Sequence, residues 1–374
     1  MLLTRFLLTN FKNYDYQLVD CAGRFNCFVG ENGSGKTNLL EAIYYLCMGK
    51  AYDSSSDQYA VQHGEDFFRL EGRFSDGKVK GSEDRIALKV QKRKRKVIER
   101  NGKAYDRLAD HVGRYPVVIV VPDDVRLVHE GSEYRRRLLN NSLSQTDPVY
   151  LEKLLTYNKV LSQRNALLKQ AGGQPLSGGL LEIYDQQLLE PASYIHAARQ
   201  AFVKPFTEQL RAAQVMISNE KETVGLRYRS QLNDQSMEEL LAERTEKDRI
   251  LQRTSGGIHR DDLVFTQEDH PLKKVASQGQ LKTFVLSLKL AQYHLLRQQS
   301  GKRPLLLLDD IFDKLDSKRV TQLLQLINQP EEYGQIFISD TDPERMQRLL
   351  ASVVETDYAQ FRVAAGSLQT EVKV

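Results

Sequence analysis

The chain has 374 residues, and its 53 Lys and Arg nearly balance 49 Asp and Glu, for a formal net charge of +4. Apolar residues make up 41% and charged residues 27%, a globular composition large enough for about two domains. No apolar run approaches the roughly 18 residues that a membrane-spanning helix needs. The three cysteines lack zinc-like spacing and fit a reducing compartment. We therefore expect a cytoplasmic protein without membrane contact.

The small net charge conceals an uneven distribution. Residues 85–104 contain nine Lys and Arg but a single acid, Glu99, so the rest of the chain is slightly acidic. Any attraction to a polyanion must therefore come from local patches.

The first part of the chain is predicted to form short strands and one helix. A Gly-rich loop leads into the helix, Lys36–Met48, and an Asn-Gly pair marks a hairpin. The predicted strands are Leu2–Leu8, Asp15–Val19, Phe25–Val29, Phe67–Phe74, Ile86–Val90, Val97–Arg100, Lys103–Tyr105 and Val117–Val121.

The middle of the chain is predicted to be mostly helical, because apolar residues recur there every three or four positions. A Gly/Pro/Ser loop, Ala171–Gly179, separates two long helices, and one strand, Val224–Tyr228, interrupts the pattern. Strands alternate with helices again near the end, at Leu305–Leu308 and Gln335–Ile338, before a final hairpin. We expect one α/β domain formed by both chain ends, residues 1–130 plus 251–374, with a helical arm at 131–250.

A phosphate-binding loop follows the third predicted strand. Its glycines let backbone N–H groups surround a phosphate at a helix N-terminus, while a lysine reaches the β- and γ-phosphates and a threonine binds Mg²⁺. The loop matches G-x-x-x-x-G-K-[ST] in full and consists of Gly30, Glu31, Asn32, Gly33, Ser34, Gly35, Lys36 and Thr37.

Two acids end the apolar strand at Leu305–Leu308. Asp309 is placed to hold Mg²⁺ or its water, and Asp310 is the candidate base for the attacking water. Alone, the pattern would fit a buried strand that ends in solvated acids. Together with the phosphate loop it favours nucleotide hydrolysis, with Lys36, Asp309 and Asp310 as catalytic candidates.

A second loop and helix resemble the signature element of ABC-type ATPases. In that family the signature loop contacts the γ-phosphate bound by another subunit, and here it reads Ser277, Gln278, Gly279 and Gln280. A competing match, Leu176-Ser177-Gly178-Gly179, lies between the two arm helices, and we interpret it as a connection.

The whole chain resembles the RecF family of bacterial recombination mediators, SMC-like ATPases with an ABC-type head. Besides the phosphate loop and the acids, the residues that carry the likeness are Asn10-Phe11-Lys12-Asn13-Tyr14, Gly257-Ile258-His259-Arg260-Asp261-Asp262-Leu263, Ser277–Gln280 and Leu315-Asp316. The chain departs from the family where Ile258 replaces proline and where Asp313-Lys314 replaces Ser-Glu. It has Ser339-Asp340-Thr341 where many ABC heads carry a switch histidine, so the γ-phosphate sensor is unassigned.

The resemblance implies an ATP-gated homodimer. Two subunits would meet head to tail across two ATP molecules, with Mg²⁺ at Thr37 and Asp309 and with Asp316 at the seam. Lys12 and Asn13 would approach the nucleotide, or else form an ordinary polar turn. Asp310, shorter than the glutamate of transporter heads, implies slow, DNA-stimulated hydrolysis that releases the clamp.

The resemblance also implies a DNA partner. The expected targets are double-stranded DNA and single-strand/double-strand junctions, and the expected roles are recombinase loading at gaps, fork repair and the SOS response, together with RecR and RecO. The candidate DNA contacts are Lys92, Arg93, Lys94, Arg95, Lys96, Arg135, Arg136 and Arg137.

Several alternatives remain open at the level of sequence. The basic run fits a solvated hairpin as well as a DNA contact. The block around His259 and Asp261 could be mistaken for a metal site, but a hydrogen-bonded corner is favoured. An ABC-type ATPase of a transport or defence machine, or a small-molecule P-loop kinase, would also use the phosphate loop.

Overall fold

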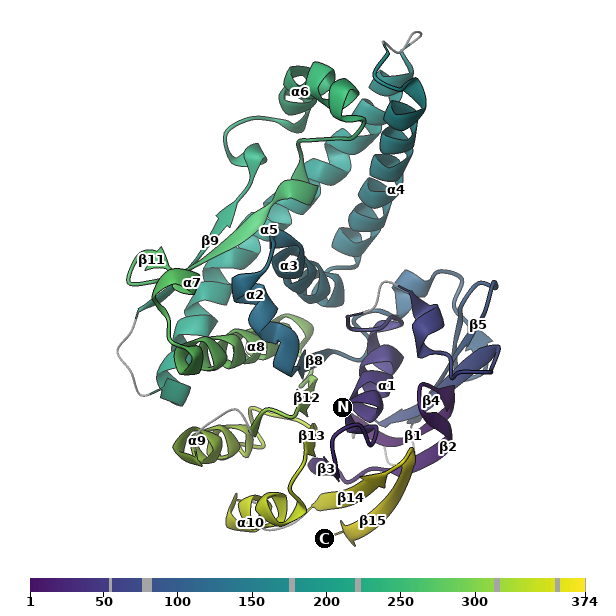
Figure 1. The fold of residues 1–374 in the computed structure, drawn as a ribbon, viewed down its shortest axis with the longest axis vertical. Helices are drawn as coiled ribbons and strands as arrows, with labels where there is room; N and C mark the ends of the chain where they lie inside the picture. The colour runs from purple at the N-terminus through teal and green to yellow at the C-terminus, as the bar shows by residue number, and fades with distance from the viewer. Residues whose placement is uncertain are drawn as a thin grey trace. The chain divides into compact units, whose positions relative to one another are not determined.

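The structure is a computed structural model that describes residues 1–53, 56–75, 83–174, 179–218, 223–312, 317–353 and 357–373 (Figure 1). It divides into two compact units. The first contains Met1–Asp124, Ala212–Glu220 and Gln278–Val374, and the second contains Val125–Arg211 and Lys221–Ser277. Compared with the arm expected at 131–250, the second unit begins earlier, at Val125, lacks residues 212–220 and includes residues 251–277.

The first unit contains an antiparallel sheet with the strand order β2-β1-β4-β5-β6-β7. One face is apolar because buried side chains alternate with exposed ones, and Leu8, Leu70, Leu88 and Ile98 form one buried row across four strands. The strands are β1 (Leu2–Phe11), β2 (Tyr14–Asp20), β4 (Phe67–Ser75), β5 (Glu83–Gln91), β6 (Val97–Arg100) and β7 (Lys103–Ala104).

A second sheet of the first unit has the order β15-β14-β3-β13-β12-β8. Its central strands are parallel and entirely buried, which fits their uninterrupted apolar sequences. The strands are β3 (Phe25–Val29), β8 (Val117–Val120), β12 (Leu305–Asp309), β13 (Ile336–Asp340), β14 (Tyr358–Ala364) and β15 (Ser367–Lys373). Because β3 pairs with β13 and β14, both ends of the chain build this sheet, as predicted.

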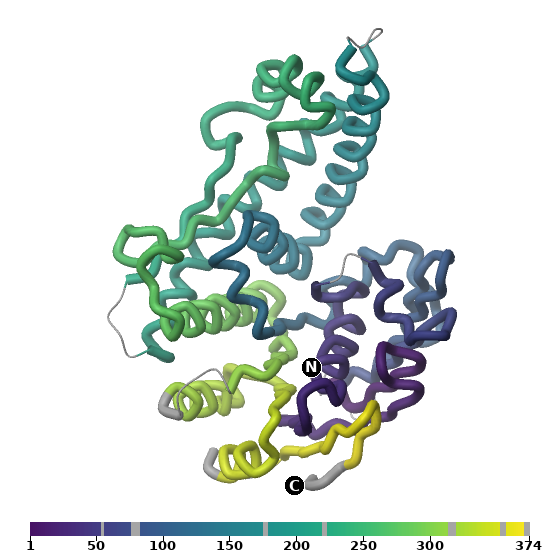
Figure 2. Tube along the Cα trace, in the orientation of Figure 1, coloured from purple at the N-terminus to yellow at the C-terminus, as the bar shows by residue number. Residues whose placement is uncertain are grey.

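Helices cover both faces of the second sheet. Helix α1 (Lys36–Met48) packs in a core shared by the two sheets. The opposite face of the second sheet packs against α8 (Gln278–Ser300), α9 (Ser317–Ile327) and α10 (Pro343–Val353). Figure 2 shows the same unit receiving chain from both the purple and the yellow ends of the sequence.

The second unit is mostly helical, with a small sheet ordered β11-β10-β9. Its longest helix, α5, continues through Pro191 and Pro205. The elements are α2 (Arg126–His129), α3 (Ser132–Thr146), α4 (Pro148–Ala171), α5 (Leu180–Ser218), β9 (Val224–Arg229), α6 (Met237–Leu251), β10 (Asp262–Gln267), β11 (His270–Pro271) and α7 (Leu272–Val275). Short 3-10 turns lie at Asp57–Ala60, Leu108–His111, Pro122–Val125, Gln231–Asn233 and Ile258–Arg260.

Most predicted elements are confirmed within one to three residues, and the helix at Lys36–Met48 has the predicted bounds. The competing signature match lies between α4 and α5, but its residues 176–178 lie outside the described residues. Among the helices that the structure describes, none is long and apolar enough to cross a membrane.

Candidate nucleotide site and basic surfaces

The phosphate loop connects β3 to α1 and depends on glycine at two crowded positions. Gly30 has φ 156° and Gly35 has φ 115°, conformations that other residues rarely adopt. A Cβ atom at Gly30 would lie 2.2 Å from the Val363 carbonyl oxygen, and one at Gly35 would lie 2.6 Å from Asn13 Nδ2. The loop can therefore take this path only with glycine at both positions.

Lys36 folds back over the loop. Its Nζ donates to the carbonyl oxygens of Gly30, at 2.7 Å, and Glu31, at 2.8 Å. The side chain is 6% exposed, so its charge is held close to the backbone N–H groups of the loop. A bound phosphate in the loop would meet both this ammonium group and the N-terminus of α1.

The β1–β2 turn supports the loop. Asn13 Nδ2 donates to the Ser34 carbonyl oxygen at 3.1 Å, and the Tyr14 hydroxyl donates to the Gly35 carbonyl oxygen at 3.2 Å. Lys12 instead forms an ion pair with Glu41 of α1. The structure thus places Asn13 against the phosphate loop and holds Lys12 against the helix that follows it.

The acid at the end of β12 faces the threonine of the loop. Asp309 Oδ1 accepts hydrogen bonds from Thr37 Oγ1 at 3.0 Å and from Ser339 Oγ at 2.6 Å. Asp309 is 3% exposed, and this burial raises the pKa of its carboxyl. Thr37 and Asp309, the two residues expected to share Mg²⁺, are therefore in direct contact.

Ser339 joins the two neighbouring acids. Its hydroxyl donates to Asp309 and accepts from the Asp310 backbone N–H at 2.9 Å. Asp310 has φ 48°, a left-handed conformation that costs energy outside glycine. Its buried Oδ1 has no hydrogen-bond partner among the residues that the structure describes. From the sequence alone, Ser339 stands out only as a departure from the switch histidine.

The donor set at this position suits Mg²⁺. Thr37 and Asp309 present two hard oxygen atoms, and Mg²⁺ usually takes one or two protein oxygens plus substrate phosphates and water. Within the described ranges, no group of three or more His, Cys, Asp or Glu is arranged to hold a metal alone. The residues thus fit a cation that arrives with a nucleotide.

The predicted signature loop begins helix α8. Ser277 and Gln278 are exposed, and the Gly279 carbonyl oxygen accepts from Thr283 Oγ1 at 3.1 Å and from Arg319 Nη1 at 3.5 Å. Gln280 occupies the first turn of α8. Asp316 and its neighbours Lys314 and Leu315 lie outside the described residues.

Farther along α8, a buried lysine fixes the helix to the core. Lys289 Nζ lies 3.0 Å from Asp124 Oδ1 and donates to the Tyr52 hydroxyl at 2.6 Å and the Ile119 carbonyl oxygen at 2.9 Å. Burial lowers the pKa of Lys289, while Asp124 opposes that change. This cluster anchors α8 to the end of β8.

The basic run of the first unit is only partly available to solvent. Lys92, Arg93, Lys94 and Arg95 are exposed in the turn between β5 and β6. Lys96 differs, because its Nζ lies 2.6 Å from Asp57 Oδ2 and its side chain is 14% exposed. Four of the five candidate DNA contacts in this run are therefore exposed.

The three arginines of α3 have different surroundings. Arg135 Nε lies 2.6 Å from Asp262 Oδ1, and its side chain is 12% exposed. Arg136 Nη1 donates to the Asp261 carbonyl oxygen at 2.9 Å. Arg137 forms a longer ion pair, 3.5 Å, with the exposed Glu133.

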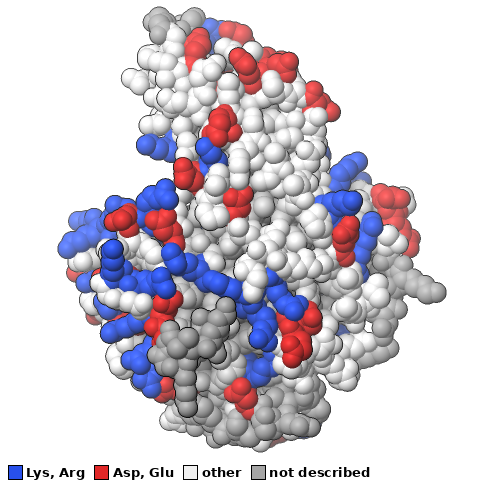
Figure 3. Space-filling model, turned by 180° about the vertical axis from the view of Figure 1, so that it is seen from behind, with Lys and Arg blue, Asp and Glu red and all other residues white. Residues whose placement is uncertain are grey.

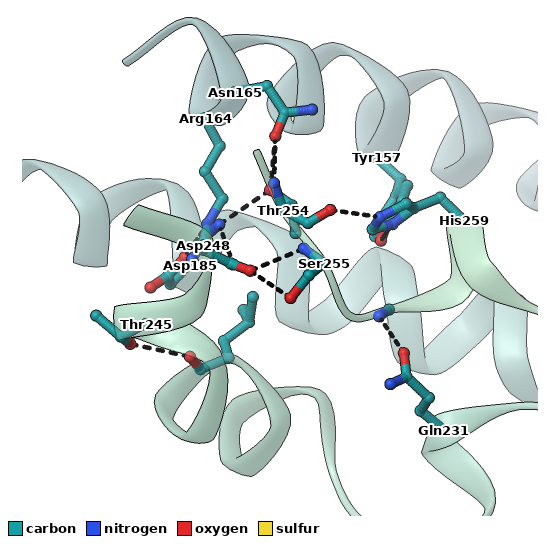
Figure 4. Close-up of polar contacts among 12 residues, drawn as sticks. Tyr157, Arg164, Asn165, Asp185, Gln231, Thr245, Asp248, Thr254, Ser255 and His259 are labelled. Atoms are coloured by element: carbon teal, nitrogen blue, oxygen red, sulfur yellow. Dashed lines mark hydrogen bonds and ion pairs between the residues drawn. The ribbon is translucent and has the colours of Figure 1, made fainter. Parts of the chain in front are cut away.

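The block around His259 forms the hydrogen-bonded corner that the sequence favoured. His259 Nδ1 lies 2.8 Å from the Tyr157 hydroxyl, and Figure 4 shows the two side chains facing each other. Buried Asp261 pairs with buried Arg199 at 2.6 Å. Burial lowers the pKa of His259 to about 4, so the imidazole is neutral near pH 7.

Comparisons with known proteins extend over the whole chain. The family model described as "RecF/RecN/SMC N terminal domain" matches residues 2–360. The DNA replication and repair protein RecF of Flavobacterium johnsoniae is 43% identical over 95% of this chain and 98% of its own. RecF of Bacteroides fragilis is 39% identical over 98% of each chain.

Solved structures give the same picture. A structure of the recombination mediator protein RecF with ATP, from the RecFOR pathway, has a TM-score of 0.87 at 29% identity and covers 99% of this chain and 98% of that one. The Smc head domain of Pyrococcus furiosus, at 15% identity and a TM-score of 0.55, covers 99% and 95% and shares the fold.

Proposed function

We propose, from the premise that this chain belongs to the RecF family of DNA replication and repair proteins, that it is an ATP-gated, dimerising DNA clamp. The observation that carries the proposal is the contact between Thr37 Oγ1 and Asp309 Oδ1 behind a complete phosphate loop. That contact joins the two elements that a nucleotide-binding ATPase needs.

ATP would lie with its phosphates in the loop Gly30–Thr37. Lys36 would turn from its backbone acceptors to the β- and γ-phosphates, while Thr37 and Asp309 would hold Mg²⁺, which supplies charge neutralisation at the phosphates. Asn13 would keep the loop in place through Ser34. Asp310 would accept the proton of the attacking water, with its backbone held by Ser339.

Two subunits would complete two nucleotide sites. Each chain carries one phosphate loop and one signature loop, Ser277–Gln280, and we propose that the signature loop of one subunit covers the γ-phosphate of the other. Asp316 belongs to the proposed seam. Hydrolysis would be slow and DNA-stimulated, and it would open the dimer.

The proposed ligand is double-stranded DNA, including single-strand/double-strand junctions. The exposed run Lys92–Arg95 supports phosphate contact that is independent of base sequence, since the chain contains no base-reading motif. RecR and RecO are the proposed partners, because a structural relative at 29% identity belongs to the RecFOR pathway. The proposed roles are recombinase loading at gaps, fork repair and the SOS response, in the cytoplasm.

Analytical ultracentrifugation tests this function. Wild type, Lys36→Arg and Ser277→Arg would be sedimented without nucleotide, with ADP and with Mg²⁺-ATP, each with and without a duplex. Only wild type with ATP is expected to form dimers, because Lys36→Arg loses the phosphate contact and Ser277→Arg blocks the opposite subunit. Monomeric wild type under every condition would contradict the two-subunit mechanism.

The samples with duplex DNA distinguish this function from that of an ABC-type ATPase in another machine. A transport or defence subunit would bind ATP equally well but would gain nothing from duplex DNA. Dimers that form with ATP and never sediment with the duplex would therefore favour that alternative.

A further inference from the structure

The small sheet of the second unit presents arginines on its outer face. Along β9, Leu226 and Tyr228 are buried while Arg227 and Arg229 are exposed, as the alternation of a strand requires. Arg229 pairs in register with Asp262, and Arg227 with Val264 of β10. The two guanidinium groups thus project from the same face of the sheet, from positions about 7 Å apart along the strand.

More arginines than acids surround the start of β10. Asp262 is contacted by both Arg135, at 2.6 Å, and Arg229, at 3.2 Å, while Asp261 is neutralised by the buried Arg199. The Arg229 side chain is 70% exposed, so its contact with Asp262 leaves much of the guanidinium open to solvent. Two buried carboxylates are therefore shared among more cations than they can neutralise.

Arg136 adds a further cation at the same position. It donates to the backbone carbonyl oxygen of Asp261, not to a carboxylate. Burial and then the neighbouring Arg199 lower the pKa of Arg136, whereas Asp261 and Asp262 raise it by less. Arg136 therefore adds a cation to this cluster without taking up the carboxylate of Asp261 or Asp262.

Arg260 lies two residues before Asp262 and is exposed. Its neighbours on both sides are held inside the unit, since the preceding His259 contacts Tyr157 and the following Asp261 pairs with Arg199 at 2.6 Å. Among the described residues, Arg260 has no side-chain hydrogen bond or ion pair. A rigid 3-10 turn, Ile258–Arg260, therefore presents an unpaired guanidinium to solvent.

We propose that Arg227, Arg229 and Arg260 form a phosphate-binding surface for duplex DNA on the second unit. The inference rests on the proposed DNA-binding function and names a contact surface for it. This arginine surface differs from the arginines of α3 that the sequence favoured, because Arg135 is mostly buried and paired with Asp262. It requires no base contacts, so its contribution to affinity is electrostatic and independent of base sequence.

The surroundings favour a nucleic-acid backbone over an acidic protein segment. The outer-face neighbours Val264 and Thr266 are small and partly exposed, so they provide no apolar pocket for the side chains of a peptide. Two exposed acids at the β10–β11 turn, Glu268 and Asp269, are followed by two exposed lysines, Lys273 and Lys274.

Charge also limits the surface to one part of the second unit. Helix α6 carries five acids and three cations, Arg244, Lys247 and Arg249, so its net charge is −2. In the view of Figure 3, acidic and uncharged residues predominate at the upper end. A polyanion would therefore be attracted to the β9–β10 end of the second unit and repelled by α6.

Salt-dependent duplex binding tests the inference. Binding of a fluorescent duplex of random sequence would be measured with Mg²⁺-ATP at several salt concentrations for wild type, Arg229→Ala/Arg260→Ala, Arg260→Lys and Lys169→Ala. Lys169 is an exposed cation of α4, 12 residues beyond Tyr157, or about 18 Å along the helix axis. The Lys169→Ala substitution therefore removes one positive charge far from the arginine surface.

The double variant is expected to bind at least about tenfold more weakly at moderate salt. Its plot of log affinity against log salt should lose about 2 from the wild-type slope, close to one per lost phosphate contact. Arg260→Lys should retain most of the affinity, and Lys169→Ala should change it by less than about twofold. All variants should still dimerise with ATP, because none of the substitutions touches the nucleotide site.

If the double variant binds the duplex with wild-type affinity and wild-type salt slope, the inference is wrong. The same result is expected if the surface binds an acidic protein and not DNA. That result leaves the proposed function standing, since wild type still binds the duplex. Wild type that binds no duplex in any nucleotide state would contradict both the proposed function and this surface. An equal loss in Lys169→Ala would also overturn the inference, because the effect would then follow total charge.

Discussion

At the scale of single residues, one hydroxyl group organises the acids of the nucleotide site. Ser339 connects the Asp309 carboxylate to the Asp310 backbone N–H, and Asp309 in turn accepts from Thr37. The candidate metal-binding acid, the candidate base and the phosphate loop are thus linked through a single side chain on β13. Ser339 is a positioning residue in this account, since it acts through Asp309 and Asp310.

Ser339→Ala is expected to weaken Mg²⁺-dependent ATP binding by roughly tenfold or more, because Asp309 loses the hydroxyl that holds its carboxylate beside Thr37. Binding of Mg²⁺-free nucleotide should change little, and Ser339→Thr should restore the wild-type values. Isothermal titration with and without Mg²⁺ measures the difference. Equal losses in both conditions would mean that Ser339 only stabilises the fold.

A buried histidine in the first unit predicts sensitivity to acid. His111 is fully buried and its Nε2 lies 2.6 Å from the Leu46 carbonyl oxygen. Burial lowers the pKa of His111 to about 4, below the ordinary value of 6.5. The unfolded chain therefore takes up this proton first as the pH falls, so the folded state loses stability between about pH 6.5 and pH 4.

The free energy of unfolding should fall by about 2 kcal/mol from this residue between pH 7 and pH 5. His111→Gln removes the titration, so its unfolding free energy should depend less on pH over this range even if it is lower throughout. Denaturant unfolding at the two pH values measures both. Parallel losses in wild type and variant would assign the acid sensitivity to other groups.

At the scale of elements, a polar network holds the chain after α6 against α4. Arg164 Nη1 donates to Asp248 Oδ2 at 2.7 Å and to Thr254 Oγ1 at 2.9 Å, while Asp248 also accepts from the Ser255 backbone and hydroxyl. Figure 4 shows these groups converging on the Arg164 guanidinium, with Asp185 of α5 beside it. The buried Arg164–Asp248 network thus fixes Thr254 and Ser255, which precede Arg260 in the chain.

Arg164→Met is expected to cost about 3–5 kcal/mol, because Asp248 is fully buried and would keep an unpaired charge. Lys153→Met is the matched control on the same helix. It breaks the Lys153–Glu190 pair, where Glu190 is 64% exposed, and should cost less than about 1 kcal/mol. Equal changes in the two melting curves would refute a special role for the buried network.

The parts of the candidate nucleotide site could be found in the sequence because they are local motifs. The phosphate loop lies within eight consecutive residues, and the strand before Asp309 is a continuous apolar run, so both could be found without knowing the fold. Their contact followed from what such motifs do together, since 272 residues separate Thr37 from Asp309.

Side-chain pairing between distant elements could not be predicted. The Arg135–Asp262 ion pair joins residues 127 positions apart, and a basic triplet gives no sign of which arginine is neutralised. The placement of β3 between β13 and β14 and the passage of α5 through two prolines likewise depend on tertiary packing. These pairings determine which of the candidate DNA contacts remain exposed.

At the scale of the whole molecule, the two ends of the chain assemble one ATPase unit around β3, and the middle supplies a second unit with its own buried network. The nucleotide site and the exposed run Lys92–Arg95 belong to the first unit, and the arginine surface belongs to the second. Each surface alone would offer a few phosphate contacts. In an ATP-held dimer all of them would be present twice, so ATP should raise DNA affinity well above that of a monomer.

The most direct test of this account is the affinity of wild type for one duplex, measured by fluorescence anisotropy at fixed salt without nucleotide, with Mg²⁺-ADP and with Mg²⁺-ATP. The account predicts at least about tenfold tighter binding with Mg²⁺-ATP than in the other two states, and no such gain in Lys36→Arg. Equal affinity in all three nucleotide states would contradict the claim that ATP gates the binding of DNA.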